Sequence, residues 1–96
     1  MDWQQKFKAI RSLNPFDTSL MMRDRGDWYL HHGVERKEGG GLSGGLTSGE
    51  TPEEAITQAW DWFTDPKYYI VVNAYRNNRR AVKWNGFMWE DITEEK

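Results

Sequence analysis

Apolar residues recur at helical spacing in two segments of the chain. In residues 2–13, Trp3, Phe7 and Ile10 lie three or four positions apart. In residues 51–64, a second apolar stripe is formed by Ala55, Ile56, Ala59, Trp60 and Phe63. A three-to-four-residue spacing places side chains on one face of a helix, so each pattern predicts an amphipathic helix with one face toward a core.

The start of the second helix is the most specific local signal in the chain. Thr51 can accept a hydrogen bond from backbone amides of the first turn, and Pro52 suits the first helical position, where no donor is needed. Glu54 follows three positions after Thr51, as in a capping box. The residues Thr-Asp-Pro at 64–66 predict where this helix ends.

Alternation of apolar and polar residues predicts an N-terminal hairpin. Residues 28–35 are expected to form one strand that pairs with the glycine-rich residues 42–48. The inward face of the first of these strands is predicted to carry Trp28, Leu30, His32 and Val34. Residues 20–22 fit either a short strand or an apolar plug within a loop.

The C-terminal third predicts a three-stranded meander. Residues 68–75 are rich in β-branched and aromatic residues and are expected to form a central strand, and residues 79–84 return as its partner. An Asn-Gly pair at 85–86 is typical of a two-residue hairpin turn, which would pair Trp84 with Phe87.

Together these elements predict a single α+β domain over residues 1–96, with a frayed tail at residues 93–96. The expected architecture is an antiparallel sheet of four to five strands with two helices, in the order α-β-β-α-β-β-β. Thirteen basic against fifteen acidic residues argue against a protein that coats nucleic acid through charge alone. The absence of cysteine excludes disulfides and thiol catalysis, and with no signal-like or membrane-spanning segment we expect a cytoplasmic protein.

The candidate chemistry does not favour an enzyme. His31 and His32 are neighbours on a predicted strand, so they point to opposite faces and cannot share one metal ion. The glycine-rich residues 39–45 lack the lysine and the following helix of a phosphate-binding loop, and no Gly-x-Ser-x-Gly motif is present. We therefore expect no catalytic activity, no metal and no cofactor.

A basic hairpin flanked by aromatic residues is the strongest candidate for binding. Six tryptophans are more than one small core usually needs, and large aromatics are enriched at interfaces. Arginines beside aromatic rings suit a protein contact, a single-stranded nucleic-acid platform or a solubilising surface. The predicted contact residues are Tyr75, Arg76, Arg79, Arg80, Trp84, Trp62 and Trp89.

The N-terminal helix offers a second candidate surface. Three cations, Lys6, Lys8 and Arg11, lie near Trp3 and Phe7. Such a helix can dock on an acidic partner, or it can simply cover the sheet.

Residues 44–63 run from a glycine pair through Thr-Pro-Glu-Glu-Ala into the second helix, and this junction resembles that of HicB-type antitoxins. The short, tryptophan-rich, cysteine-free chain also resembles the small accessory proteins of bacteriophages. That resemblance implies a non-enzymatic protein, in the cytoplasm of its bacterial host, that binds and inhibits or modulates a host or defence protein, as anti-CRISPR proteins do. We expect a monomer or a homodimer. A single-stranded nucleic-acid-binding module and a HicB-like antitoxin-type regulator are the alternatives.

Overall fold

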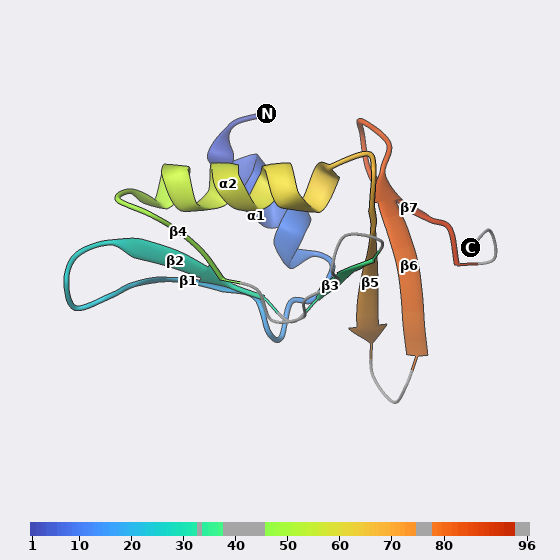
Figure 1. The fold of residues 1–96 in the computed structure, drawn as a ribbon, viewed down its shortest axis with the longest axis horizontal. Coiled ribbons are helices and arrows are strands. Elements are labelled where there is room, and N and C mark those ends of the chain that lie inside the picture. The colour runs from blue at the N-terminus through green and yellow to red at the C-terminus, as the bar shows by residue number, and fades with distance from the viewer. Residues whose placement is uncertain (33, 38–45, 75–77, 94–96) are drawn as a thin grey trace.

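The computed structural model describes residues 1–32, 34–37, 46–74 and 78–93, which form two helices and seven strands (Figure 1). The N-terminal half contains α1 (Trp3–Arg11), β1 (Ser19–Met22), β2 (Trp28–His31), β3 (Glu35–Lys37) and β4 (Leu46–Gly49). The C-terminal half contains α2 (Pro52–Thr64), β5 (Tyr69–Ala74), β6 (Asn78–Trp84) and β7 (Trp89–Asp91). The α+β class is as expected from the sequence.

The strands form two antiparallel sheets rather than one. The first has the order β1-β2-β4, and the second has the order β3-β5-β6-β7. Both helices lie on one side of the first sheet, and β5 and β6 run across the direction of β1 and β2 (Figure 1). The expected single sheet and its strand order were therefore wrong, because β3 is an additional strand and the chain divides between two sheets. Residues 20–22, for which a short strand was one of two alternatives, do form a strand within β1.

The division occurs inside the segment that was expected to be one strand. Residues 28–31 pair with β1 and β4, whereas residues 35–37 pair with β5. His32 and Val34, which lie between the two strands, are both buried. The alternation of buried positions thus continues through the segment, but alternation does not specify which strand is the partner. Residues 42–45 of the expected hairpin lie outside the described part of the chain.

Both helices begin at side-chain caps. Asp2 and Gln5 form a reciprocal capping box at α1, with N–H to oxygen distances of 2.8 and 2.9 Å. At α2 the Thr51 hydroxyl accepts from the Glu54 N–H at 3.1 Å, as predicted. The Glu54 carboxylate, however, accepts from the N–H of Glu50 at 2.8 Å, one residue before the position that a capping box would use.

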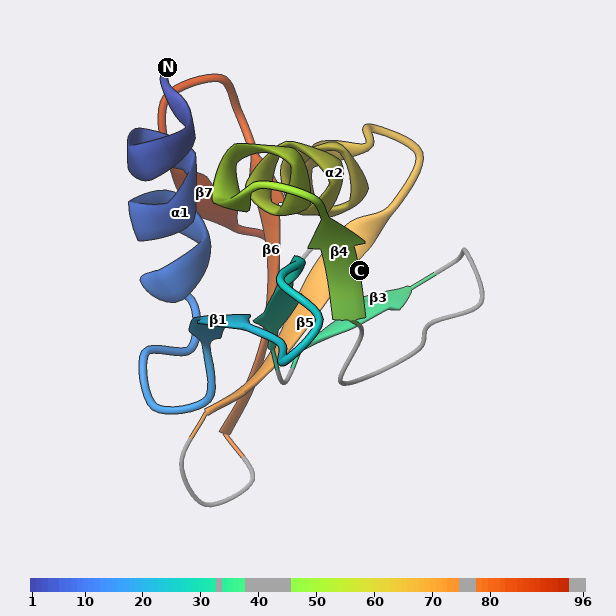
Figure 2. The same ribbon diagram turned by 90° about the vertical axis from the view of Figure 1, so that its left-hand side faces the viewer.

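The predicted stripe of α2 faces the core. Ala55, Ile56, Ala59 and Phe63 are buried, and Trp60 is half-buried. The core that these residues share with α1 and both sheets includes Ile10, Leu30, Ile70, Val72 and Val82. α2 therefore joins the two sheets, and α1 packs beside it (Figure 2).

The last hairpin differs in register from the sequence prediction. Trp84 pairs with Trp89, not with Phe87, so four residues rather than two form the loop. The Asn85 side-chain oxygen accepts from the N–H groups of Phe87 and Met88 at 2.9 and 3.0 Å, and Gly86 has a φ of 103°. The Asn-Gly pair does initiate the turn, but the hydrogen bonds of the Asn85 side chain stabilise a longer loop, in which Phe87 is 91% exposed.

Candidate partner-binding site

The predicted contact residues are distributed over several parts of the molecule. Tyr75 and Arg76 lie outside the described residues, and the backbone of Arg79 pairs with Asn73. Arg80 is exposed and pairs with Val72 in the ladder between β5 and β6. Arg80 and Trp84 are four positions apart along the strand, which corresponds to about 13 Å.

Trp84 and Trp89 lie together and contact the helices. Their ring centroids are 5.1 Å apart, and those of Trp60 and Trp84 are 4.9 Å apart, both in edge-to-face geometry. The indole N–H of Trp89 donates to the Ala9 carbonyl at 2.8 Å. Both predicted contact residues are half-buried, and each uses part of its ring to pack the C-terminal hairpin against the helices. Partner binding by them stays a prediction.

Trp62 belongs to a cluster at the C-terminal end of α2, which Phe63 connects to Trp89. Its ring centroid lies 5.1 Å from that of His32 and 5.0 Å from that of Phe63. The Arg36 guanidinium lies between two rings, 4.9 Å from that of Trp62 and 4.2 Å from that of Tyr68, and donates to the Trp62 carbonyl at 3.2 Å. This stack joins β3 to α2.

His32 is enclosed in the same cluster. Its side chain is 1% exposed, which confirms the expected inward position, and its Nδ1 has no hydrogen-bond partner among the described residues. Burial, with a smaller contribution from the neighbouring His31, lowers the pKa of His32 to about 4. The imidazole is therefore neutral at pH 7 and acts as a packed aromatic ring.

A groove between α1 and β1 combines apolar and basic side chains. Its volume is about 500 Å³, and its walls are formed by Trp3, Gln4, Phe7, Lys8 and Arg11 of α1 and Leu20 of β1. The five α1 positions recur at helical spacing and form one face of the helix. The lower end of α1 lies next to β1 (Figure 2).

The floor and the rim of this groove differ in character. Trp3, Phe7 and Leu20 are half-buried and pack against the core, so each leaves part of its apolar surface open to solvent. Lys8 and Arg11 are exposed on the rim, and neither forms an ion pair with another described residue. The sequence indicated the basic and aromatic residues of α1, but not Leu20 as the opposite wall.

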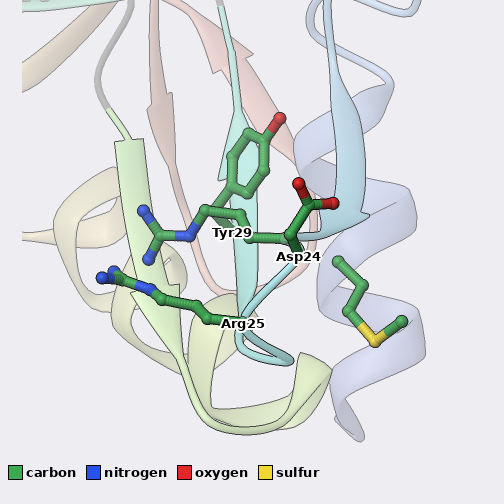
Figure 3. Close-up of a pocket in the computed structure, with 5 residues that line it drawn as sticks. Asp24, Arg25 and Tyr29 are labelled. Atoms are coloured by element: carbon green, nitrogen blue, oxygen red, sulfur yellow. The ribbon is translucent and has the colours of Figure 1, made fainter.

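A second hollow of about 580 Å³ lies at the turn between β1 and β2. Arg23 and Arg25 both bind the Asp27 carboxylate, with Nε to Oδ1 distances of 3.1 and 3.2 Å. These hydrogen bonds lower the pKa of Asp27 to about 2. The Asp24 and Arg25 side chains point in different directions beside Tyr29 (Figure 3). Because Asp27 already holds both arginines, this hollow is a weaker anion site than the groove along α1.

The described residues contain no cluster of three or more histidine, aspartate or glutamate side chains suited to a metal ion. Neither helix in these ranges has the length and apolar character needed to cross a bilayer. No protein-family model, curated protein or solved structure matches the chain.

Proposed function

We propose that this protein is a non-enzymatic binding protein that occupies a surface on a macromolecular partner through the α1–β1 groove. In this role it modulates or inhibits its partner, in the manner of the small proteins that bacteriophages direct against host or defence components. The observation that carries the proposal is the combination, along one side of α1, of open aromatic surface and exposed cations that form no ion pair with another described residue.

The composition of the groove is that of an interface. Tryptophan and arginine are enriched among residues that dominate binding energies, and an apolar centre with a charged rim is the usual anatomy of a contact surface. Trp3 and Phe7 supply the apolar surface, while Arg11 and Lys8 supply the rim. α1 is held by its capping box and by the bond from Trp89 to Ala9, so it presents these side chains from a rigid element.

The first test is affinity purification of the tagged full-length protein from a nuclease-treated lysate of its host. Lys8→Glu is the groove variant, and Lys67→Glu is its control because Lys67 is also exposed, does not line the groove and undergoes the same change of charge. We expect the wild-type protein and the control to retain a stoichiometric protein partner that Lys8→Glu loses.

Urea unfolding of both variants shows whether a loss reflects the groove or the fold. Equal recovery of the partner by Lys8→Glu would overturn the groove as the binding site. If the wild-type protein recovers no protein from the treated lysate, and only nuclease-sensitive material from an untreated control lysate, the proposal as a whole is overturned and nucleic-acid binding is favoured.

A further inference from the structure

We infer that the natural occupant of the α1–β1 groove is an acidic amphipathic helix of a partner protein. The inference rests on the proposed function and identifies the chemistry of the partner. It follows from the shape of the groove, from its charge and from the order in which its apolar and basic side chains occur along α1.

The shape of the groove suits a helix. Five of its six lining residues belong to α1, and they extend from Trp3 to Arg11, which is about 12 Å along the helix axis or a little over two turns. A helix laid beside α1 presents apolar residues at three-to-four-residue spacing along the same length. An added strand would instead pair with the backbone of β1, which is four residues long and contributes one side chain, Leu20.

The charge of α1 specifies an acidic partner. The whole chain has a formal net charge of −2, yet the nine residues of α1 contain three cations and no aspartate or glutamate. Lys8 and Arg11 in the last turn favourably oppose the negative end of the helix dipole. That interaction leaves their charge open to solvent, so carboxylates of a partner can still pair with it.

The apolar and the basic side chains of α1 occur in a definite order along the groove. Trp3 lies in the first turn of α1 and Phe7 at its middle, whereas Lys8 and Arg11 lie in its last turn. An occupant therefore places its apolar anchors beside Trp3 and its carboxylates beside Arg11. This arrangement determines which end of the bound helix carries its acidic residues.

The test uses two synthetic helical peptides of two to three turns. Both carry leucine and phenylalanine anchors at three-to-four-residue spacing followed by a charged end, which is glutamate in the first peptide and lysine in the second. Each is titrated into ¹⁵N-labelled full-length protein. We expect the glutamate peptide to shift the amides of residues 3–11 and of Leu20, and to bind at least about tenfold more tightly than the lysine peptide.

Charge-reversal variants and a spin-labelled peptide test where the peptide binds and in which direction it lies. Lys8→Glu and, independently, Arg11→Glu should each weaken binding of the glutamate peptide by about tenfold, whereas Lys67→Glu should not. Raising the salt concentration should weaken binding as well, because exposed charge pairs are screened. A nitroxide at the glutamate end of the peptide should broaden the resonances of Arg11 more than those of Trp3.

The experiments distinguish a failure of this inference from a failure of the proposed function. Equal affinity of the two peptides, or shifts that map elsewhere, would overturn the acidic helix as the occupant. If Lys8→Glu still loses the lysate partner, the proposed function survives with a partner of different chemistry. If sedimentation shows a dimer that Lys8→Glu dissociates, the occupant is a second copy of this chain and the inference is wrong.

Discussion

The indole N–H of Trp89 donates a hydrogen bond to the carbonyl of Ala9 over 2.8 Å, joining β7 to α1 across 80 positions of sequence. Ala9 lies between Lys8 and Arg11, two lining residues of the α1–β1 groove. The same indole packs edge to face against Trp84. The position of the groove helix therefore depends on the last strand of the second sheet.

Replacing Trp89 with phenylalanine should test this connection. The variant keeps an aromatic ring but loses the hydrogen bond and part of the ring volume, so we expect the free energy of unfolding to fall by roughly 1–3 kcal/mol. Urea denaturation followed by circular dichroism measures the change. Phe87→Ala is the control, because Phe87 is 91% exposed and its removal should leave stability nearly unchanged.

Gly49 marks a close approach between the end of β4 and the start of α2. A Cβ atom at this position would lie 2.5 Å from the Cβ of Glu54 and 2.8 Å from the backbone nitrogen of Ala55. Gly49→Ala should therefore destabilise the protein by roughly 1–3 kcal/mol, since neither neighbour is a flexible side-chain end. The melting temperature of Gly49→Ala is compared with that of Ser48→Ala, a substitution at an exposed position of the same strand. An unchanged melting temperature would contradict this packing.

Burial of His32 should make stability depend on pH. The pKa of its imidazole is about 4 in the fold, below the ordinary value of 6.5, so the unfolded chain binds the proton more readily. The stability that this group contributes is complete above about pH 6.5 and is lost as the pH falls toward 4, by up to about 3 kcal/mol. His32→Gln should flatten the profile of unfolding free energy in this window, whereas His31→Gln, at an exposed position, should preserve it.

The Arg36 guanidinium should be sensitive even to a change that conserves its charge. It stacks between Trp62 and Tyr68 and donates to the Trp62 carbonyl. Lysine keeps the positive charge but lacks the planar group, so Arg36→Lys should lower the free energy of unfolding by about 1 kcal/mol. Arg80→Lys is the matched control at an exposed site, and equal losses in the two variants would rule out the stack as a stabilising contact.

The basic hairpin remains an independent prediction from the sequence. Joint replacement of Arg79 and Arg80 with alanine should weaken partner binding while leaving thermal stability nearly unchanged. The affinity purification described above measures binding, with Lys8→Glu as the comparison. Full recovery of the partner by the arginine variant would remove this hairpin from the binding surface.

The sequence by itself determined the elements whose causes are local. The apolar spacing of residues 51–64 and the Thr51 cap identified α2 and its buried stripe, because helix periodicity and capping depend on residues a few positions apart. Alternation likewise identified Leu30, His32 and Val34 as inward positions. The basic and aromatic residues of one wall of the groove were also recognisable.

Only the tertiary structure decided how these elements meet. The chain passes from one sheet to the other around His32 and Val34, and Leu20 becomes the wall opposite α1. Trp89 finds its partners on both helices, which no local pattern could specify. The physical reason is that periodicity records which side of an element is buried, whereas strand partners and groove walls arise from contacts between residues far apart in the chain.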